Sequence, residues 1–294
     1  MKETAILIGR FQVPEMNAAY RKLIESVKQT HGQVVLVLAE PGVPVSQENP
    51  LPLQSRIAMI KAAFPDLKIL SLKDHPLDDE WSRQLDQLLS NNLESNSLVI
   101  YGTKERFINQ YQGKHKTAEL PDKKPESSSV EEESSSISFR KGMVYASAKR
   151  YPTVFPTVDV AVFRKDRSEI LLGKKDADGK WRFIGGFADP SDQGFPASAK
   201  RELREECGDI ETTEFTYEGS FRIDDWRYRF EKDKIITTLF STDYVSGEIQ
   251  AQDDIAELKW LSLAELSSLM ESDKTASEHS QMFRSMLKKY HQER

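Results

Sequence analysis

Residues 5–101 alternate short apolar runs with stretches of helical periodicity, and this rhythm constrains the fold more than any other feature. The runs Val34–Leu38 and Ser97–Tyr101 are nearly continuous in β-branched and aliphatic residues, which is typical of strands covered on both faces. The sequence therefore predicts an α/β domain over residues 1–150 with a doubly wound parallel sheet. The expected strands are Ala5–Ile8, Val34–Leu38, Ile69–Leu72 and Leu98–Tyr101, and the expected helices are Ala18–Val27, Arg56–Ala63 and Trp81–Leu89.

After Pro156 the pattern changes to strands separated by turns, interrupted by one strong helix at Pro196–Cys207. This order predicts an α+β domain over residues 151–294, with helices packed on a mixed sheet, and a boundary near Tyr151. The expected strands are Thr157–Arg164, Glu169–Leu172, Phe183–Gly186, Phe215–Ile223, Lys234–Tyr244 and Ala256–Ser262, and two further helices are expected at Leu263–Met270 and Thr275–His291.

A polar segment separates the two patterns. Residues 117–136 are rich in Lys, Pro, Glu and Ser, without an apolar period, so we expect a mobile loop there. Ile137–Ala148 regains helical character and is expected to pack on the first domain.

Length and composition limit the class of protein. A chain of 294 residues suggests about two domains, and 38% hydrophobic residues suffice for two cores. The net charge of -6 gives no reason to expect nucleic acid or membrane as a partner. A single cysteine, Cys207, excludes an internal disulfide and fits a reducing, cytoplasmic setting. The apolar run at the start is too short for a signal peptide, so we expect a soluble protein.

Three glutamates concentrate on the helix expected at Pro196–Cys207. Glu202, Glu205 and Glu206 are spaced three and four residues apart, so their carboxylates project from one face. Such a cluster suits a hard divalent cation, Mg²⁺ or Mn²⁺. Arg201 could fix one carboxylate through a bidentate pair.

Acidic runs on helices are often only solvated surfaces, so the context decides. Here Gly185 and Gly186 follow an apolar strand, and a loop with a further acid precedes the helix. The two glycines allow the backbone to approach a ligand closely, and a carbonyl at Gly185 could complete a metal shell.

This stretch resembles the Nudix box, whose pattern is G, five residues, E, seven residues, then R-E-U-x-E-E-x-G-U, where U is a bulky aliphatic residue. Gly186 and the run 201–208, with sequence RELREECG, match directly. Three departures concern the loop and the end of the motif: Asp192 replaces the first glutamate, one extra residue precedes Arg201, and Asp209 replaces an aliphatic residue. The resemblance extends over about residues 151–270.

The resemblance implies metal-dependent hydrolysis of a nucleoside diphosphate linked to another moiety, with metal held by Glu202, Glu205 and Glu206. Such ions neutralise diphosphate oxygens and lower the pKa of the attacking water. The general base varies within the family. One candidate is Glu202, and the others lie in the later segment 252–260, at Asp253, Asp254 or Glu257.

Cations and aromatic residues are the candidates for substrate recognition. We expect at least one of the cations to face phosphate, and an aromatic side chain could stack on a base. On a strand, residues 224–229 would place their aromatic and basic side chains on opposite faces. The candidate cations are Lys174, Lys175, Arg182, Arg222, Arg227 and Arg229, and the candidate aromatic residues are Trp181, Trp226 and Tyr228.

The first domain carries Gly9, Arg10, Phe11 and Gln12 between a strand and a helix, where phosphate commonly binds. With residues 49–56 and Arg140, this stretch resembles the nicotinamide mononucleotide adenylyltransferase family, and more closely the bacterial proteins that fuse such a domain to an ADP-ribose-hydrolysing Nudix domain. The family's H-x-G-H signature is missing, because residues 15–18 read EMNA. We therefore predict that the nucleotidyltransferase-like domain has lost adenylyl transfer.

Two hypotheses follow for the whole chain. The first is a divalent-metal-dependent pyrophosphatase acting on a small nucleotide substrate, ADP-ribose or a related molecule. The second is a non-catalytic regulator that binds NAD-related nucleotides. The intact helix glutamates favour the first, and a homodimer is the assembly that the resemblance suggests.

Overall fold

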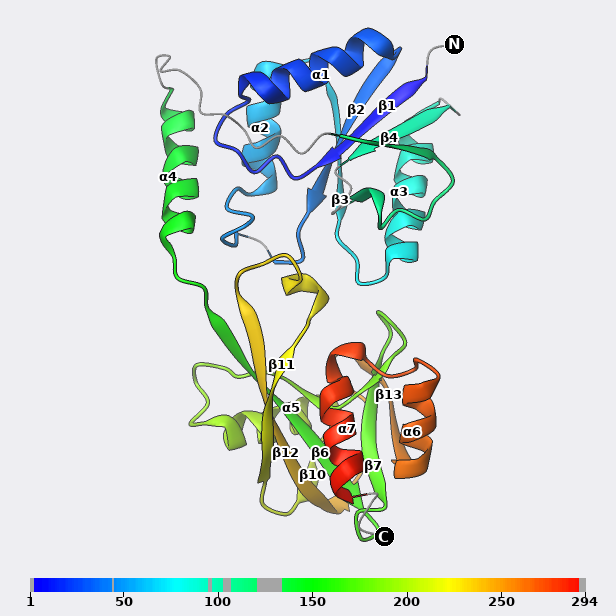
Figure 1. The fold of residues 1–294 in the computed structure, drawn as a ribbon. Helices are drawn as coiled ribbons and strands as arrows, with labels where there is room; N and C mark the ends of the chain where they lie inside the picture. Colours follow the sequence, from blue (N-terminus) through cyan, green and yellow to red (C-terminus); the bar gives the residue numbers. More distant parts are fainter. Residues whose placement is uncertain (1–2, 44, 95–96, 103–106, 121–133, 291–294) are drawn as a thin grey trace. The chain divides into compact units, whose positions relative to one another are not determined.

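The computed structural model of the chain describes residues 3–43, 45–94, 97–102, 107–120 and 134–290 (Figure 1). Its contacts divide the chain into two compact units. The first comprises Met1–Tyr151 with Phe230–Lys232, and the second comprises Pro152–Arg229 with Asp233–Arg294.

The first unit is built on a five-stranded parallel sheet. The strands follow the order β3-β2-β1-β4-β5, in which the second half of the sheet grows outward from β1. This order is the hallmark of a doubly wound sheet. The strands are β1 (Thr4–Gly9), β2 (Gln33–Glu40), β3 (Lys68–Lys73), β4 (Leu98–Gly102) and β5 (Lys116–Glu119).

Helices cover both faces of this sheet. The helices α1 (Ala18–Thr30) and α2 (Leu53–Ala63) pack on one face through residues such as Ile24 and Ile60. The helix α3 (Asp78–Asn92) packs on the other face through Leu85 and Leu89. The predicted doubly wound α/β fold of the first domain is confirmed.

The polar segment 117–136 is only partly the loop that its composition predicts. Its first residues belong to β5, which pairs with β4 in parallel, so the expectation of a loop was wrong there. Backbone hydrogen bonds to a buried neighbouring strand outweigh the polarity of these side chains. Ser135 and Ser136 begin α4 (Ser135–Lys149), and residues 121–133 lie outside the described residues.

The second unit is built on an eight-stranded mixed sheet. The long strands β6 and β12 run parallel at its centre, and the other pairs are antiparallel. The predicted mixed sheet is therefore confirmed. The strands are β6 (Val154–Arg164), β7 (Glu169–Lys175), β8 (Trp181–Arg182), β9 (Ile184–Phe187), β10 (Ile210–Thr212), β11 (Thr216–Ile223), β12 (Lys234–Gly247) and β13 (Ile255–Ser262).

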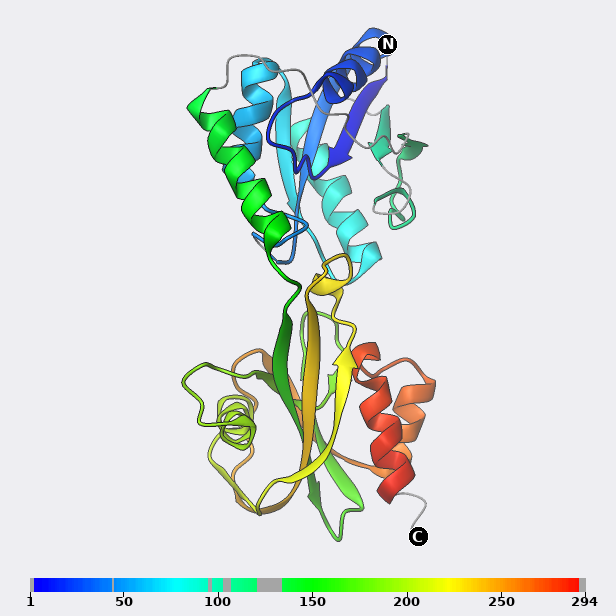
Figure 2. The same cartoon turned by 60° about the vertical axis from the view of Figure 1, so that its left-hand side comes forward.

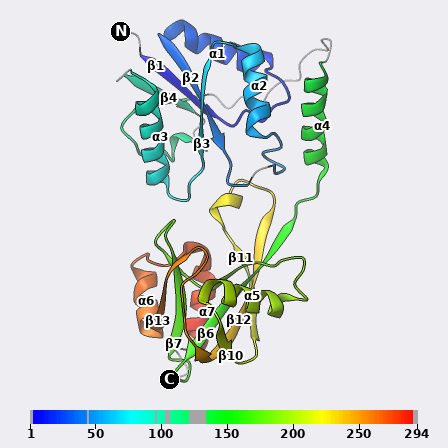
Figure 3. The same ribbon diagram turned by 180° about the vertical axis from the view of Figure 1, so that it is seen from behind.

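Helices lie on opposite faces of the mixed sheet, as Figures 2 and 3 show. The helix α5 (Phe195–Cys207) packs Leu203 and its neighbours on one face. The helices α6 (Leu263–Glu271) and α7 (Ser280–Tyr290) pack on the other, where Phe283 is fully buried. We call these the α5 face and the α7 face. None of the helices in the described part of the chain is both long and apolar enough to cross a bilayer.

Two predicted elements of this unit differ in the structure. The strand predicted at Phe183–Gly186 is observed as β9 (Ile184–Phe187), and a separate short strand, β8 (Trp181–Arg182), precedes it. The helix predicted from Thr275 begins only at Ser280, after the short 3-10 helix η3 (Ser277–His279), and its predicted end at His291 lies outside the described residues. Residues 224–229 do not lie on a strand, because Asp225 caps the 3-10 helix η2 (Trp226–Tyr228) by accepting a hydrogen bond from the Arg227 amide.

Candidate active site

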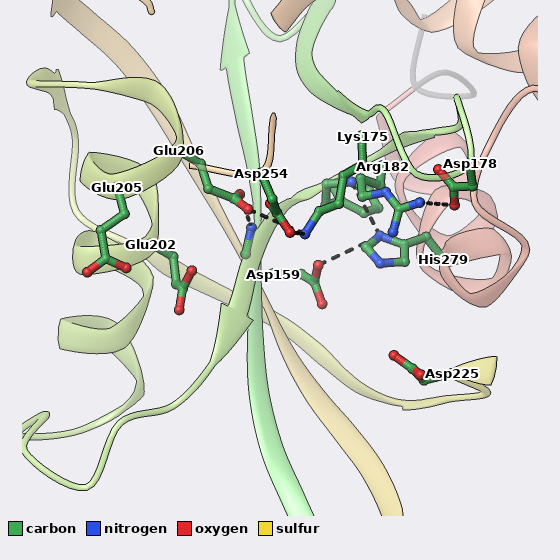
Figure 4. Close-up of polar contacts among 12 residues, drawn as sticks. Asp159, Lys175, Asp178, Arg182, Glu202, Glu205, Glu206, Asp225, Asp254 and His279 are labelled. Carbon is green, nitrogen blue, oxygen red and sulfur yellow. Dashed lines mark hydrogen bonds and ion pairs between the residues drawn. The ribbon is translucent and has the colours of Figure 1, made fainter. Parts of the chain in front are cut away.

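A pocket of about 320 Å³ opens in the second unit and receives side chains from both faces of the mixed sheet. Its volume is in the range of small-molecule sites. Glutamates of α5 line one end, and residues of β6, β8 and η3 line the other (Figure 4). The residues that line the pocket include Asp159, Lys175, Arg182, Phe183, Gly185, Gly186, Glu202, Glu205, Glu206, Ile223, Arg227, Ile235, Asp253, Asp254, Glu278 and His279.

The helix α5 presents its glutamates to the pocket because its apolar side is held against the sheet. Pro196 lies in its first turn, and Gly208 ends it with a φ of 80°, a conformation that favours glycine. Glu202 and Glu206 are buried, with 8% and 2% of their surface exposed, whereas Glu205 is exposed. All three of the predicted metal-binding glutamates therefore line one pocket.

Arg201 holds this end of the pocket in place. One terminal nitrogen of its guanidinium donates hydrogen bonds to Glu202 and Glu205, both at 2.8 Å. The other donates to the Phe187 carbonyl at 2.8 Å and to Asp192 at 3.1 Å. The bond from Arg201 lowers the pKa of Asp192 to about 2. The loop acid that departs from the Nudix pattern is thus tied to the helix by the arginine.

Glu206 is the most buried of the three glutamates. Its Oε2 accepts a hydrogen bond from the Gly185 amide at 2.9 Å, and its Oε1 lies 3.8 Å from the Lys175 ammonium. Burial raises the pKa of Glu206 to about 8, and burial also raises the pKa of Glu202. Their negative charges are costly here without nearby positive charge.

The glycine pair lets β9 approach both β6 and α5 closely. A Cβ on Gly186 would lie 2.7 Å from the Glu202 carboxylate, and a Cβ on Gly185 would lie 2.1 Å from the Val158 carbonyl. Gly185 also has a φ of 153°, which other residues rarely adopt. The amide of Gly185 faces Glu206, and a metal-binding role for its carbonyl stays a prediction.

The donor set fits a divalent cation chemically. Carboxylate oxygens of Glu202, Glu205 and Glu206 are the hard ligands that Mg²⁺ and Mn²⁺ prefer. No group of three or more His, Cys, Asp or Glu side chains in the described ranges is gathered closely enough to hold a metal ion as it stands. The geometry explains this, because Arg201 binds two of the three carboxylates and Gly185 binds the third.

The loop before β13 brings two of the proposed general bases to the pocket. The amides of Gln250 and Gln252 donate to the carbonyls of Cys207 and Glu206, so this loop is fastened to the end of α5. Asp253 and Asp254 consequently line the pocket. Asp254 also accepts a hydrogen bond from Lys175 at 2.5 Å.

Glu257 does not share this position. It lies on β13, pairs with Lys174, and is not among the residues lining the pocket. Antiparallel pairing with β7 fixes that partner, because Glu257 is directly opposite Lys174. The prediction of Glu257 as a base is therefore not supported by its placement.

The predicted substrate-binding residues fall into two groups. Lys175, Arg182 and Arg227 line the pocket. Arg222 instead is exposed and pairs with Asp224, and Trp226 and Arg229 do not line the pocket. The 3-10 turn at residues 226–228 breaks the strand alternation on which the prediction for these side chains depended. Trp181 is 8% exposed and belongs to the core.

Two pocket residues, Asp159 and His279, were missed by the sequence analysis. Asp159 lies in the middle of β6, where an acid interrupts the apolar sequence TVDVAVF. That interruption was an available signal, because a charged residue inside a buried strand needs a reason. His279 lies in η3, inside a segment predicted to be plain helix.

The candidate nucleotide-binding residues of the first unit form hydrogen bonds with other residues of that unit. Arg10 pairs with Asp74 at 2.6 Å and with Asn49 at 3.0 Å. Gln12 exchanges two hydrogen bonds with the backbone of Leu51. Gly9 ends β1, and Phe11 is buried in the core. Arg140 donates a hydrogen bond to the Pro14 carbonyl.

The chain is similar to known proteins in sequence and in structure. Residues 154–286 match the NUDIX domain family model. Among solved structures, the chain is similar over 98% of its length to a bifunctional NMN adenylyltransferase/ADP ribose pyrophosphatase from Francisella tularensis complexed with AMP and Mn ion, with 18% identity, 99% of that chain covered and a TM-score of 0.45. It is also similar over 48% of its length to the NUDIX domain of Shewanella oneidensis NrtR complexed with ADP ribose, with 20% identity, 90% of that chain covered and a TM-score of 0.39. Among curated proteins, none matches.

Proposed function

We propose that residues 154–286, which match the NUDIX domain family model, form a pyrophosphohydrolase domain that cleaves the diphosphate of ADP-ribose or a related nucleoside diphosphate derivative with the help of Mg²⁺ or Mn²⁺. With ADP-ribose, water adds to one phosphorus and the products are AMP and ribose 5-phosphate. The observation that carries the proposal is the convergence of the α5 glutamates with Lys175 and Arg182 in one pocket. Anionic helix carboxylates and cationic side chains together suit a metal-bridged diphosphate.

We propose Glu202, Glu205 and Glu206 as the residues that would hold the cation. Bound there, a divalent ion would neutralise diphosphate oxygens and lower the pKa of the attacking water. The remaining roles belong to the chain itself. Arg201 keeps Glu202 and Glu205 on the pocket side of α5, and Lys175 supplies positive charge for phosphate oxygens.

Asp254 is the base that we favour for accepting a proton from water. Asp254 lines the pocket, and its carboxylate and that of Glu206 both lie near the Lys175 ammonium. Glu257 does not line the pocket. The loop of Asp254 is fastened to the end of α5 by two backbone hydrogen bonds, so the carboxylate keeps its place relative to the helix glutamates.

For the first unit we propose a nucleotidyltransferase-like domain, with its boundary near Tyr151, that does not transfer adenylyl groups. The sequence offers no histidine pair to stabilise a transferred phosphate, and Arg10 is already paired with Asp74. Incubation of the full chain with nicotinamide mononucleotide and ATP is expected to yield no NAD.

Hydrolysis by the full chain tests the proposal directly. The substrates are ADP-ribose, NAD, diadenosine polyphosphates, nucleotide sugars and deoxynucleoside triphosphates, each with Mg²⁺ or Mn²⁺. We expect ADP-ribose turnover to fall by more than about 100-fold in Glu206→Gln, since even residues that only support a metal ligand are worth about 10–100-fold. The matched control is Glu271→Gln, which removes an exposed acid at the end of α6 and should retain full activity.

Metal binding separates the loss of a ligand from the loss of the fold. Mn²⁺ titration followed by electron paramagnetic resonance should show weaker binding in Glu206→Gln and unchanged binding in Glu271→Gln. Turnover that survives in Glu206→Gln would contradict the role of the α5 carboxylates. Nucleotide binding without turnover in the wild type would favour the non-catalytic regulator.

A further inference from the structure

The end of the pocket away from α5 has a chemistry of its own. Three apolar side chains, Phe183, Ile223 and Ile235, line it together with Asp159, Arg182 and His279. We call these six residues the α7-side recess. Along β6 the side chains alternate between faces, so Val158 packs in the core under α5 while Asp159 points to the face that carries η3 and α7. Figure 4 shows Asp159 between the α5 glutamates and His279.

Asp159 presents one oxygen to the pocket as a hydrogen-bond acceptor. Its Oδ2 accepts a hydrogen bond from the Thr237 hydroxyl at 2.5 Å. Its Oδ1 lies 3.7 Å from the Nδ1 of His279, beyond hydrogen-bonding distance. That Nδ1 accepts a hydrogen bond from the Phe183 amide at 3.3 Å, so it carries no proton to share with Asp159. Burial lowers the pKa of His279 to about 3, which keeps the ring neutral.

The cation of the recess is already paired. One terminal nitrogen of Arg182 binds Asp178, and the other lies 3.4 Å from Glu278. Asp159 is only 5% exposed, and it lines the pocket. A ligand at this position would therefore have to supply a hydrogen-bond donor to Asp159.

The recess favours a flat ring over a phosphate. Burial raises the pKa of Asp159 to about 7, and in its ionised form this carboxylate repels an anionic phosphate, which has Lys175 and the α5 end of the pocket instead. Phe183, Ile223 and Ile235 offer apolar atoms to the faces of a heteroaromatic base, and Asp159 offers an acceptor to its edge.

We propose that Asp159 is a specificity-determining residue, which accepts a hydrogen bond from the exocyclic amino group of the substrate's nucleobase and so selects adenine over hypoxanthine. This inference rests on the proposed function. A base that carries a carbonyl at the same place would set two acceptors against each other, and a buried acceptor without a donor is costly.

The test compares ADP-ribose with inosine diphosphate ribose, in which a carbonyl replaces the amino group of the base. We expect the wild type to show a kcat/KM about 10- to 100-fold higher for ADP-ribose, the range expected for one buried hydrogen bond to a charged group. Equal kcat/KM values for the two substrates in the wild type would overturn the proposal without any variant.

The variant Asp159→Asn sharpens the test because it keeps the shape of the side chain. The Thr237 hydroxyl should hold the amide oxygen at the Oδ2 position, which leaves the amide NH₂ group facing the ligand. We expect the preference for ADP-ribose to disappear or to reverse in favour of the inosine compound. A merely structural role for Asp159 would lower kcat/KM for both substrates equally, and that result would overturn the proposal. Glu271→Gln is the control and should keep the wild-type ratio.

A binding measurement separates this inference from the proposed function. If neither substrate is hydrolysed, the proposed function fails, and calorimetric titration of AMP and IMP into the wild type and Asp159→Asn still decides the role of Asp159. Tighter binding of AMP by the wild type, lost in the variant, would support the inference, and equal binding would refute it. If Asp159→Asn does not fold, Thr237→Val, which frees the carboxylate to move, should reduce the wild-type preference.

Discussion

Replacing Gly185 by alanine should destabilise the Nudix domain markedly. A Cβ at this position would lie 2.1 Å from the Val158 carbonyl and 2.9 Å from the Asp159 Cα, both of them backbone atoms that cannot turn aside. Overpacking of this kind costs about 1–3 kcal/mol. The φ of 153° adds a backbone strain of about 1–3 kcal/mol for a residue with a Cβ. The sum is about 2–6 kcal/mol, a large part of the roughly 5–15 kcal/mol that stabilises a typical protein.

Gly186→Ala provides the matched comparison one residue away. There the Cβ would lie 2.7 Å from a terminal oxygen of Glu202, which is the end of a flexible side chain. The chain can relieve this contact by moving the carboxylate, so stability should change little. Activity should nevertheless fall by about 10-fold or more, because a displaced Glu202 no longer has its place in the pocket.

Scanning calorimetry of the full chain, combined with ADP-ribose hydrolysis, tells the two glycines apart. A loss of 1 kcal/mol lowers the Tm of a domain of this size by roughly 2–4 °C, so Gly185→Ala should lower it by about 5–20 °C. Gly186→Ala should stay within about 2 °C of the wild type. A Gly185→Ala protein that melts with the wild type would refute the reasoning, since it would mean that β9 can move away from β6 at no cost.

Two further predictions concern charged networks. Arg201→Lys keeps the positive charge but cannot bind Asp192, Glu202, Glu205 and the Phe187 carbonyl together, so kcat/KM should fall by about 10–100-fold while the melting temperature changes little; an unchanged kcat/KM would show that the carboxylates do not need this arginine. Burial alone raises the pKa of Glu218, but hydrogen bonds from Lys289, Ser241 and Tyr290 outweigh burial and lower this pKa. The ionised carboxylate therefore stabilises the fold above the pKa that Glu218 has in the unfolded chain. This stabilisation is lost as the pH falls through the lowered pKa of the folded state. Glu218→Gln should therefore melt earlier than the wild type at pH 7, with a difference that shrinks below about pH 4, and a difference that is independent of pH would contradict this assignment.

The carboxylate end of the pocket could be predicted from the sequence because helix geometry is local. The spacing of Glu202, Glu205 and Glu206 decides which face of α5 they share, whatever surrounds the helix. The parallel sheet of the first unit likewise follows from its alternation of apolar runs and helical patterns.

The other end of the pocket depends on contacts between distant parts of the chain. Asp159 and His279 are 120 positions apart in the sequence. They meet only because η3 packs on the face of the sheet toward which the Asp159 side chain points. Glu257 shows the converse. Its place in an acidic segment suggested that Glu257 is a general base, but the register between β13 and β7 places it opposite Lys174, with which it pairs. Register and packing across a sheet are tertiary properties, which a single sequence does not reveal.

The pocket receives its two ends from opposite faces of one sheet, and this separation bears on how the domain can be altered by substitution. The residues that would hold the cation lie on α5. The residues of the α7-side recess that we assign to the base lie largely on β6, β8 and η3. A substitution near η3 would therefore change the end of the pocket that we assign to the base and leave the glutamates of α5 untouched. The two proposed roles, binding of the cation and choice of the base, could thus be altered independently of each other.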